Sequence, residues 1–359
     1  MPQTPAPPPP TAGRARPDFD RAAAEAALAV AVHAPSVHNS QPWQWRLESD
    51  GLLLLADRDR QLPVADPDGH SLLVSCGATL ALADLALRAG GSMVRTTRCP
   101  DPDNPDLLAR VTVLGRRQPD PDAAESVVAA LARRSDRRPF TAQPLSPHTI
   151  DALSAAANEP DVYVAFPTRD DQRIGLAVAI SQADRSEQND QAYQAEWRHW
   201  LRRPGQPNPT NDGIPLDTLP RTPPGTIRHS DVALRDFAID ADCRPLIDPH
   251  RDEHPLVAVI VTRADTPLDR LRSGEVLMRL MVQAQQIGLS TCALSQAVDF
   301  IQFRARTRVL LGWSEYPQMM VRIGYPSTSV AELPPAPRRP ATAVLRNPQP
   351  NIDHKVVSR

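Results

Sequence analysis

The sequence is poor in lysine, aromatic residues and cysteine. Among its 40 basic residues only Lys355 is not an arginine, and aromatic side chains make up 4% of the 359 residues. The number of arginines therefore reflects composition, and only their placement carries functional information. The net charge of -2 gives no reason to expect nucleic acid or an acidic membrane surface as a partner.

Several familiar signatures are missing as well. The four cysteines are far apart and form no Cys-x-x-Cys pair, so neither a disulfide framework nor a metal site is indicated. There is no uninterrupted run of about 18 apolar residues, no P-loop and no Gly-x-Ser-x-Gly or His-Glu-x-x-His motif. Six prolines among the first ten residues exclude the apolar core of a signal peptide. We therefore expect a cytoplasmic protein.

Composition divides the chain into four segments. Residues 1–17 form a Pro-rich arm that we expect to be disordered, and residues 327–359 form an extension without a core of its own. Residues 18–122 and 123–326 each alternate helical and strand patterns and form two halves. Within the second half, residues 187–249 interrupt the pattern.

The interruption starts with a polar helix that carries Trp197 and Trp200, and seven prolines follow between residues 204 and 224. A long segment without regular elements inside a compact protein is usually a functional lid or a disordered linker. The two tryptophans favour a lid that packs on the rest of the protein.

Apolar periodicity predicts the elements of both halves. Helices are expected over residues 19–34, 69–89, 123–133, 146–157 and 267–287 and from residue 168 onward; strands are expected over residues 44–48, 52–56, 93–98, 110–114, 162–166, 255–262 and 318–324. The strand at 255–262 is continuously apolar, which predicts a central strand buried on both faces. One helix in each half contains glycine, at Gly77 and Gly274, and ends at a second glycine, which is weak evidence for an internal duplication.

The first informative stretch runs from Ala34 to Trp43 and reads APSVHNSQPW. Pro35 and Pro42 forbid continuation of the preceding helix, so the stretch is a loop. Its serine, asparagine and glutamine side chains can present several hydrogen-bonding groups in one direction, as the edge of a planar heteroaromatic ring requires. On residue types alone, an ordinary helix cap followed by a surface turn is the favoured interpretation, because proline, serine and asparagine are common turn residues.

The second stretch, Arg133-Arg134-Ser135-Asp136-Arg137, follows an Ala-rich helix. Guanidinium groups and a serine hydroxyl satisfy the oxygens of a phosphate through charge-assisted hydrogen bonds. In a protein this rich in arginine, a solvated charge run is the competing interpretation.

Together the two stretches resemble the FMN-dependent nitroreductase superfamily. Arg133-Arg134-Ser135-x-Arg137 is similar to its phosphate-binding motif, and Pro35-Ser36-x-x-Asn39-Ser40-Gln41-Pro42-Trp43 is similar to its flavin-ring motif. The ring motif precedes the phosphate motif here, which resembles the longer Acg-type branch, where two degenerate halves in one chain imitate the usual dimer. The resemblance implies an α+β nitroreductase-like fold, a single-chain pseudo-dimer of two α/β halves, with one FMN between them.

The resemblance also implies which residues hold the cofactor. The flavin-ring side comprises Pro35, Ser36, Asn39 and Gln41; the phosphate side comprises Arg133, Arg134, Ser135 and Arg137; Leu294 and Ser295 lie near flavin N5; and Arg338 and Arg339 close the phosphate site. The usual loop near N5 carries an acidic residue and a glycine, where this chain has Ser295-Gln296, and this departure bears on catalysis more than on binding.

Two functions follow from the resemblance. One is an NAD(P)H-dependent oxidoreductase in which FMN passes electrons to a nitroaromatic, a quinone or another small acceptor. The other is a flavin-sequestering or stress-associated protein in which the lid covers the ring. In both, the chain acts as a monomeric pseudo-dimer or a weak homodimer, without nucleic-acid or membrane partners.

Overall fold

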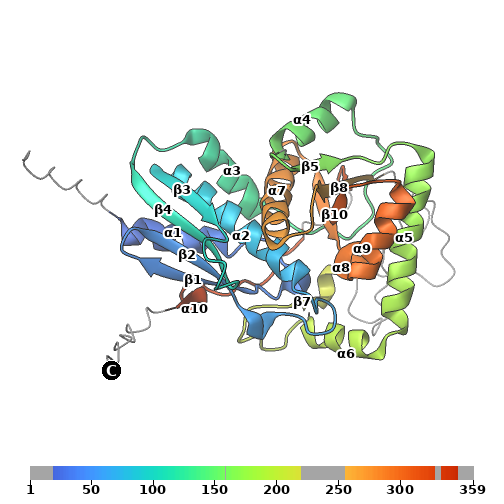
Figure 1. Ribbon diagram of the computed structural model, residues 1–359, viewed down its shortest axis with the longest axis horizontal. Helices are drawn as coiled ribbons and strands as arrows, with labels where there is room; N and C mark the ends of the chain where they lie inside the picture. The colour runs from blue at the N-terminus through green and yellow to red at the C-terminus, as the bar shows by residue number, and fades with distance from the viewer. Residues whose placement is uncertain (1–18, 158, 220–254, 328–332, 347–359) are drawn as a thin grey trace, which may run out of the picture.

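The computed structural model describes residues 19–157, 159–219, 255–327 and 333–346. They include two larger, mainly antiparallel sheets, each packed against helices, which confirms the predicted α+β class (Figure 1). The expected N-terminal arm and the part of the expected lid beyond residue 219 lie outside the described residues.

The first sheet contains five strands in the order β11-β1-β2-β4-β3. These strands are β1 (Trp43–Glu48), β2 (Gly51–Ala56), β3 (Ser92–Arg98), β4 (Leu107–Arg116) and β11 (Leu345–Arg346). The predicted hairpin is present as β1 and β2, with Glu48 paired to Gly51 across the turn. The helices of the first half are α1 (Arg21–Ala31), α2 (His70–Ala89) and α3 (Pro121–Ala132).

The second sheet contains four strands in the order β5-β8-β10-β9. These strands are β5 (Val162–Ala165), β8 (Leu256–Thr262), β9 (Ser290–Leu294) and β10 (Tyr316–Gly324), and the accompanying helices are α4 (Pro147–Ala157), α5 (Asp170–Asn189), α7 (Pro267–Gln286), α8 (Gln296–Asp299) and α9 (Ile301–Leu311). As predicted from its apolar run, β8 is buried and has a strand on each side. Strand β9 was not among the predicted strands, and it contains Leu294, which the sequence placed near the loop at flavin N5.

The two sheets share one topology. Leaving β11 aside, we number the four strands of each larger sheet by their order along the chain. In both sheets they lie side by side in the order one, two, four, three, and all neighbouring strands are antiparallel. An 11-residue helix, α1 or α4, precedes the first strand. A 20-residue helix, α2 or α7, connects the second strand to the third.

Helices α2 and α7 make the most extensive contact between any two helices of the described chain, at the centre of the molecule (Figure 1). Gly77 and Gly274 face each other where they cross. A Cβ atom on Gly77 would lie 1.9 Å from the Leu271 carbonyl oxygen, and one on Gly274 would lie 1.9 Å from that of Val74. The two glycines that were weak evidence for a duplication are therefore the residues that let the backbones touch.

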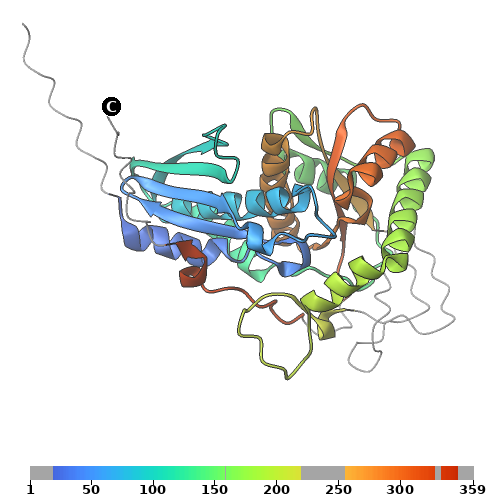
Figure 2. The same ribbon diagram turned by 60° about the horizontal axis from the view of Figure 1, so that its bottom comes forward.

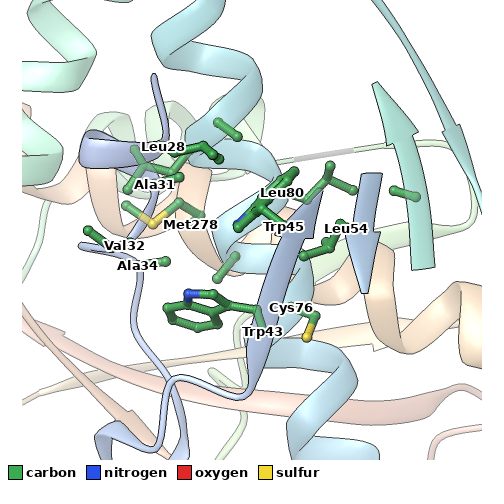
Figure 3. Packing of buried hydrophobic residues seen from close by; sticks show 14 of the residues in the cluster. Leu28, Ala31, Val32, Ala34, Trp43, Trp45, Leu54, Cys76, Leu80 and Met278 are labelled. Carbon is green, nitrogen blue, oxygen red and sulfur yellow. The ribbon is translucent and has the colours of Figure 1, made fainter. Parts of the chain in front are cut away.

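The core of each half takes side chains from the other half's central helix. Figure 3 shows Met278 of α7 among the residues around Trp43 and Trp45, in the cluster built on the first sheet. Conversely, Val74 of α2 belongs to the cluster built on the second sheet. The halves therefore do not have separate cores.

Helix α2 is also the one described helix that is long and apolar enough to cross a membrane. Its apolar surface packs instead against α1, α3, α7 and the first sheet, and two thirds of the helix is buried. Its sequence is not an uninterrupted apolar run, because Ser75, Thr79 and Asp84 lie within it.

Two further segments join the halves. Residues 187–219, which we call the insertion segment, contain α6 (Gln191–Trp200), β6 (Leu201–Arg202) and β7 (Ile214–Pro215). Trp197 and Trp200 pack in a cluster with Leu62 and Ala65 of the first half. Residues 333–346, the C-terminal segment, cross from the second half to the first, where α10 (Ala341–Val344) leads into β11 beside β1 (Figure 2).

We predict that Gly274→Ala destabilises the protein by roughly 1–3 kcal/mol, because the added methyl group forces apart two packed backbones. Gly90→Ala is the matched control, since its Cβ would lie 3.5 Å from the nearest atom at a φ of -77°. Urea denaturation measures both. If both substitutions lowered the free energy of unfolding equally, the close contact of α2 and α7 would not depend on a glycine at residue 274.

Candidate functional site

The Ala34–Trp43 stretch is a strained, firmly held loop. His38, Asn39 and Gln41 have φ values of 47°, 53° and 52°, in the left-handed region that costs non-glycine residues about 1–3 kcal/mol each. The Ser75 hydroxyl of α2 accepts a hydrogen bond from the Val37 N–H at 3.2 Å, and the Gln41 N–H donates to Ser36 Oγ at 3.0 Å. A loop that maintains such strain is a candidate for function.

The arginine stretch lies along the edge of the second sheet. Helix α3 ends at Ala132, Ser135 forms a parallel bridge with Thr291 of β9, and the Asp136 N–H donates to the Thr291 carbonyl at 2.9 Å. The one acidic residue of the stretch, Asp136, forms an ion pair with Arg138 at 2.8 Å. The neighbouring arginines are therefore left without this carboxylate.

A cavity of about 210 Å³ lies between the two stretches. Ten of the twelve residues predicted to hold a cofactor line it: Pro35, Ser36, Asn39, Arg133, Arg134, Ser135, Arg137, Leu294, Ser295 and Arg338. The structure thus brings together residues that are up to 303 positions apart in the chain, from Pro35 to Arg338.

The other two predicted residues, Gln41 and Arg339, lie outside the cavity lining. The Arg339 N–H donates to Gln41 Oε1 at 2.8 Å, and the Gln41 amide donates to the Asn211 carbonyl at 3.0 Å. Arg339 also pairs with Asp57 at 3.5 Å. These two residues fasten the C-terminal and insertion segments to the loop.

Asn39 lines the cavity, but its side chain, like that of Gln41, binds the insertion and C-terminal segments. Its amide group donates to the carbonyls of Gly213 and Pro337, both at 2.9 Å. Its Oδ1 accepts from Arg338 Nη1 at 2.9 Å. One side chain therefore connects the loop, the insertion segment and the C-terminal segment.

Arginines dominate the charge of the cavity wall. Five arginines and two histidines are among its described lining residues, and no aspartate or glutamate is: Arg133, Arg134, Arg137, Arg322, Arg338, His33 and His38. Arg133, Arg134 and Arg338 form no ion pair with any described carboxylate, and we refer to these three as the cationic cluster.

Burial and mutual repulsion act on this cluster. Burial, followed by the charge of Arg134, lowers the pKa of Arg133 to about 10. Burial and then the charges of Arg133 and Arg134 lower the pKa of Arg338 to about 9. Both guanidinium groups remain charged at neutral pH, so the site holds positive charge that no carboxylate of the described residues compensates.

The guanidinium groups also have unused donors. Arg133 Nη2 reaches the His33 carbonyl only at 3.5 Å, and Nε and Nη1 of Arg133 have no partner in the described part of the chain. Arg338 Nε is likewise buried without a partner there. Buried charged donors without acceptors are costly, and a bound anion with several oxygens is the group that would satisfy them.

The opposite wall of the cavity contains hydroxyl groups connected to buried carboxylates. Ser295, directly after β9, donates to Asp299 at 3.0 Å, and Ser71 of α2 donates to the same carboxylate at 3.1 Å. Asp66 is buried nearby and accepts the N–H groups of Ser71 and Leu72. Sequence reasoning missed Ser71, Asp66 and Asp299, because no motif relates residues from three separate elements.

The insertion and C-terminal segments both contribute residues to the lining of the cavity. Trp197, Ile214 and Thr218 contribute to the lining, and His38 packs edge-on against Trp197 with ring centroids 4.7 Å apart. The buried Asp212 holds this part in place, because it pairs with Arg60 of the first half and with Arg202 at 2.5 Å.

Comparison with known proteins places the chain in a family. No family model matches it. The Mycobacterium tuberculosis protein Rv3131, provisionally named an NAD(P)H nitroreductase, is 31% identical over 326 residues, which cover 90% of each chain. Acg from the same organism, named in the same provisional way, is 31% identical over 89% of this chain and 94% of its own. The chain belongs to the nitroreductase superfamily.

Other matches have less informative names or are more distant. The uncharacterized M. tuberculosis protein Rv3127 is 32% identical over 89% of this chain and 92% of its own. A crystal structure of a Bacteroides fragilis nitroreductase with bound FMN matches 58% of this chain and 92% of its own at 12% identity, with a TM-score of 0.36.

Asp66 makes a testable contribution to the pH dependence of stability. Burial, reinforced by the charges of Asp299 and Asp68 and opposed by the N–H groups of Ser71 and Leu72, raises the pKa of Asp66 from 3.8 to about 7. The folded protein therefore binds this proton more tightly than the unfolded chain. The raised pKa of Asp66 therefore increases the free energy of unfolding at about pH 4. This contribution declines as the pH rises and is lost above about pH 7.

We predict that Asp66→Asn reduces the loss of stability between pH 5 and pH 8 by roughly 1–3 kcal/mol. Urea denaturation of the cofactor-free protein at both pH values measures it. The control is Asp171→Asn, an exposed carboxylate paired with Arg169. An unchanged pH dependence in Asp66→Asn would show that Asp66 is ionised throughout this range.

Proposed function

We propose that the cavity binds one FMN. The observation that carries this proposal is the buried cationic cluster, whose charges and free N–H donors fit a phosphate dianion. Ser135 lies beside the cluster and supplies a hydroxyl for the same group. Residues 35–39 of the loop and residues 294–295 would hold the flavin ring on either side.

We infer that the chain is a single-chain pseudo-dimer. The shared strand order of the two sheets, the paired helices α2 and α7 and the exchange of core side chains between halves support this inference. A pseudo-dimer of identical halves has two equivalent sites. Here the loop motif occurs only in the first half and the arginine motif only at the start of the second, so we expect one site.

The leading function is an NAD(P)H-dependent oxidoreductase that acts on nitroaromatics, quinones or other small acceptors. Bound FMN would supply the hydride and electron transfer chemistry. The protein's residues would orient the ring, neutralise the phosphate through the cationic cluster and exclude water by means of Trp197 and the C-terminal segment. The names of the relatives Rv3131 and Acg support this class.

A flavin-sequestering protein is the second candidate, and one specific observation favours it. The insertion segment is not loosely placed over the cavity but is fixed by the Asn39 amide and by the Asp212 ion pairs. In this function the segment acts as a lid that keeps nicotinamide and acceptor away from the ring. The two candidates differ in whether NADPH reaches the bound flavin.

For the phosphate site, we predict that Arg133→Met weakens FMN binding by ~1.5–3 kcal/mol, about 10-fold to 100-fold, by removing charge-assisted hydrogen bonds. Riboflavin, which lacks the phosphate, should bind equally well to both proteins. The cofactor-free variant should also unfold at a higher temperature than the parent, because an uncompensated buried charge is gone.

Fluorescence titration and thermal unfolding measure these effects, and Arg169→Met, on the exposed surface, is the control that should change none of them. Equal weakening of FMN and riboflavin binding would place the phosphate elsewhere. A colourless purified protein that takes up no FMN would contradict both candidate functions.

For the lid, we predict that Asp212→Ala accelerates reduction of bound FMN by NADPH, because Arg60 and Arg202 lose the carboxylate that holds the insertion segment. Anaerobic stopped-flow absorbance measures the rate. Asp217→Ala, in an exposed position of the same segment, is the control. Rapid reduction of the parent protein supports the oxidoreductase. Reduction only by dithionite in the parent, with NADPH effective in Asp212→Ala, supports sequestration.

A further inference from the structure

His33 lines the cavity beside the cationic cluster but belongs to neither sequence motif. It follows the end of α1, where its N–H donates to the Val30 carbonyl at 3.0 Å. Its own carbonyl accepts from Arg133 Nη2 at 3.5 Å and from Arg338 Nη2 at 3.3 Å. The backbone of His33 therefore lies between two of the three clustered guanidinium groups.

The imidazole of His33 is partly buried, and no hydrogen bond joins it to another residue of the described chain. The charged groups that face it are Arg338 of the C-terminal segment and Arg134 and Arg133, which follow α3. Burial, followed by these three positive charges in that order, lowers the pKa of His33 below its ordinary value of 6.5. In the cofactor-free protein the ring is therefore neutral at pH 7.

The cationic cluster offers an anion fewer hydrogen bonds than its three charges suggest. Arg134 Nη1 donates to three backbone carbonyls at the end of α3. Both terminal nitrogens of Arg338 already donate within the protein. The buried nitrogens without an acceptor in the described residues are Nε of all three arginines and Nη1 of Arg133. A terminal phosphate has three strongly accepting oxygens, so these four nitrogens leave acceptor positions for a further donor.

A bound phosphate reverses the electrostatic preference of the His33 ring. Three positive neighbours disfavour the imidazolium form, whereas a phosphate group carries a charge of about -1.5 to -2 and favours it. Protonation also gives the ring two N–H donors in place of one. A proton that moves from solvent to the imidazole therefore adds both a charge and a donor when the anion binds.

We propose that His33 is a further ligand of the FMN phosphate and takes up one proton from solvent when the cofactor binds. The proposal rests on the proposed FMN site and adds a regulation of that site by pH. Because binding consumes a proton, the affinity for FMN falls as the pH rises from 7 to 8. Mild acidification then tightens retention of the cofactor.

Other groups that titrate near the cavity have to be distinguished from His33. The phosphate has a second pKa of about 6 and is mostly a dianion above pH 7, and neighbouring arginines make it release protons rather than bind them. Arg133 and Arg338, with pKa values of about 10 and about 9, are already charged. His38 also lines the cavity, and Asp66, whose pKa is about 7, lies behind the Ser71 N–H.

Isothermal titration calorimetry of the cofactor-free protein with FMN measures the proton uptake, in two phosphate-free buffers of different ionisation enthalpy. At pH 7.4 we expect the parent to take up about 0.5–1 proton and His33→Gln none. Between pH 7 and pH 8 the affinity for FMN should fall about 3-fold to 10-fold in the parent and stay nearly constant in His33→Gln. The advantage of the parent should therefore shrink as the pH rises, whereas a merely structural defect in the variant would keep the ratio constant. Riboflavin should bind to both proteins without proton uptake.

The control variants are Asp66→Asn and His148→Gln, which removes an exposed histidine of α4, and both should retain the proton uptake. Absence of uptake in the parent would overturn the proposal, even if His33→Gln failed to fold. Uptake that persists in His33→Gln, or that is lost in His38→Gln or Asp66→Asn instead, would assign the proton to another group and overturn it as well. Failure to bind both FMN and riboflavin would contradict the proposed site itself, whereas FMN binding without proton uptake would remove only the role of His33.

Discussion

The crossing of α2 and α7 is the contact on which the rest of the structure depends. Because Gly77 and Gly274 have no side chains, the two helix backbones meet and each helix reaches into the core of the other half. Helix α2 then carries three hydroxyl residues one turn apart on one face. Thr79 bonds the Ala31 carbonyl at the end of α1, Ser75 bonds the strained loop, and Ser71 bonds Asp299 of the second half.

The central contact therefore produces an asymmetric site from symmetric parts. The fold repeats the same strand order twice, but the loop is anchored to α2 of the first half, and the arginine stretch lies along β9 of the second. Strain in the loop and repulsion within the cationic cluster both act against the folded state. Such features persist where the rest of the fold is stable enough to maintain them, and a bound anion would relieve the repulsion within the cationic cluster.

Much of this could be predicted from the sequence, for physical reasons that differ among elements. The β1–β2 hairpin, the buried strand β8 and helices α2 and α7 follow from strong local patterns of apolar residues and glycine. The cavity-lining residues of the two stretches could be identified because each motif is contiguous. Strand β9 was missed because it is a short edge strand that depends on β10 for its hydrogen bonds. The parallel pairing of β11 with β1 was missed because it joins residues 300 positions apart, Trp45 and Leu345.

The roles of Asn39 and Gln41 were beyond sequence reasoning for another reason. Their amides fit a flavin edge and a backbone carbonyl equally well, and only the fold decides which group is near. The structure places segments from residues 211–213 and 337–339 against them. Chemical type therefore predicted that these side chains would form directed hydrogen bonds, but not with which partners.

This arrangement has a thermodynamic consequence for the proposed cofactor. Arg338 belongs to the cationic cluster and also donates to Asn39 Oδ1, while the Asn39 amide holds both covering segments. An anion that fixes Arg338 therefore stabilises the position of Asn39 and, through it, the closed cover. By linkage, the covering segments must strengthen anion binding by the same factor. Loosening the cover should then accelerate access to the ring and weaken retention of the cofactor together, so tight retention and slow access are one property of this site.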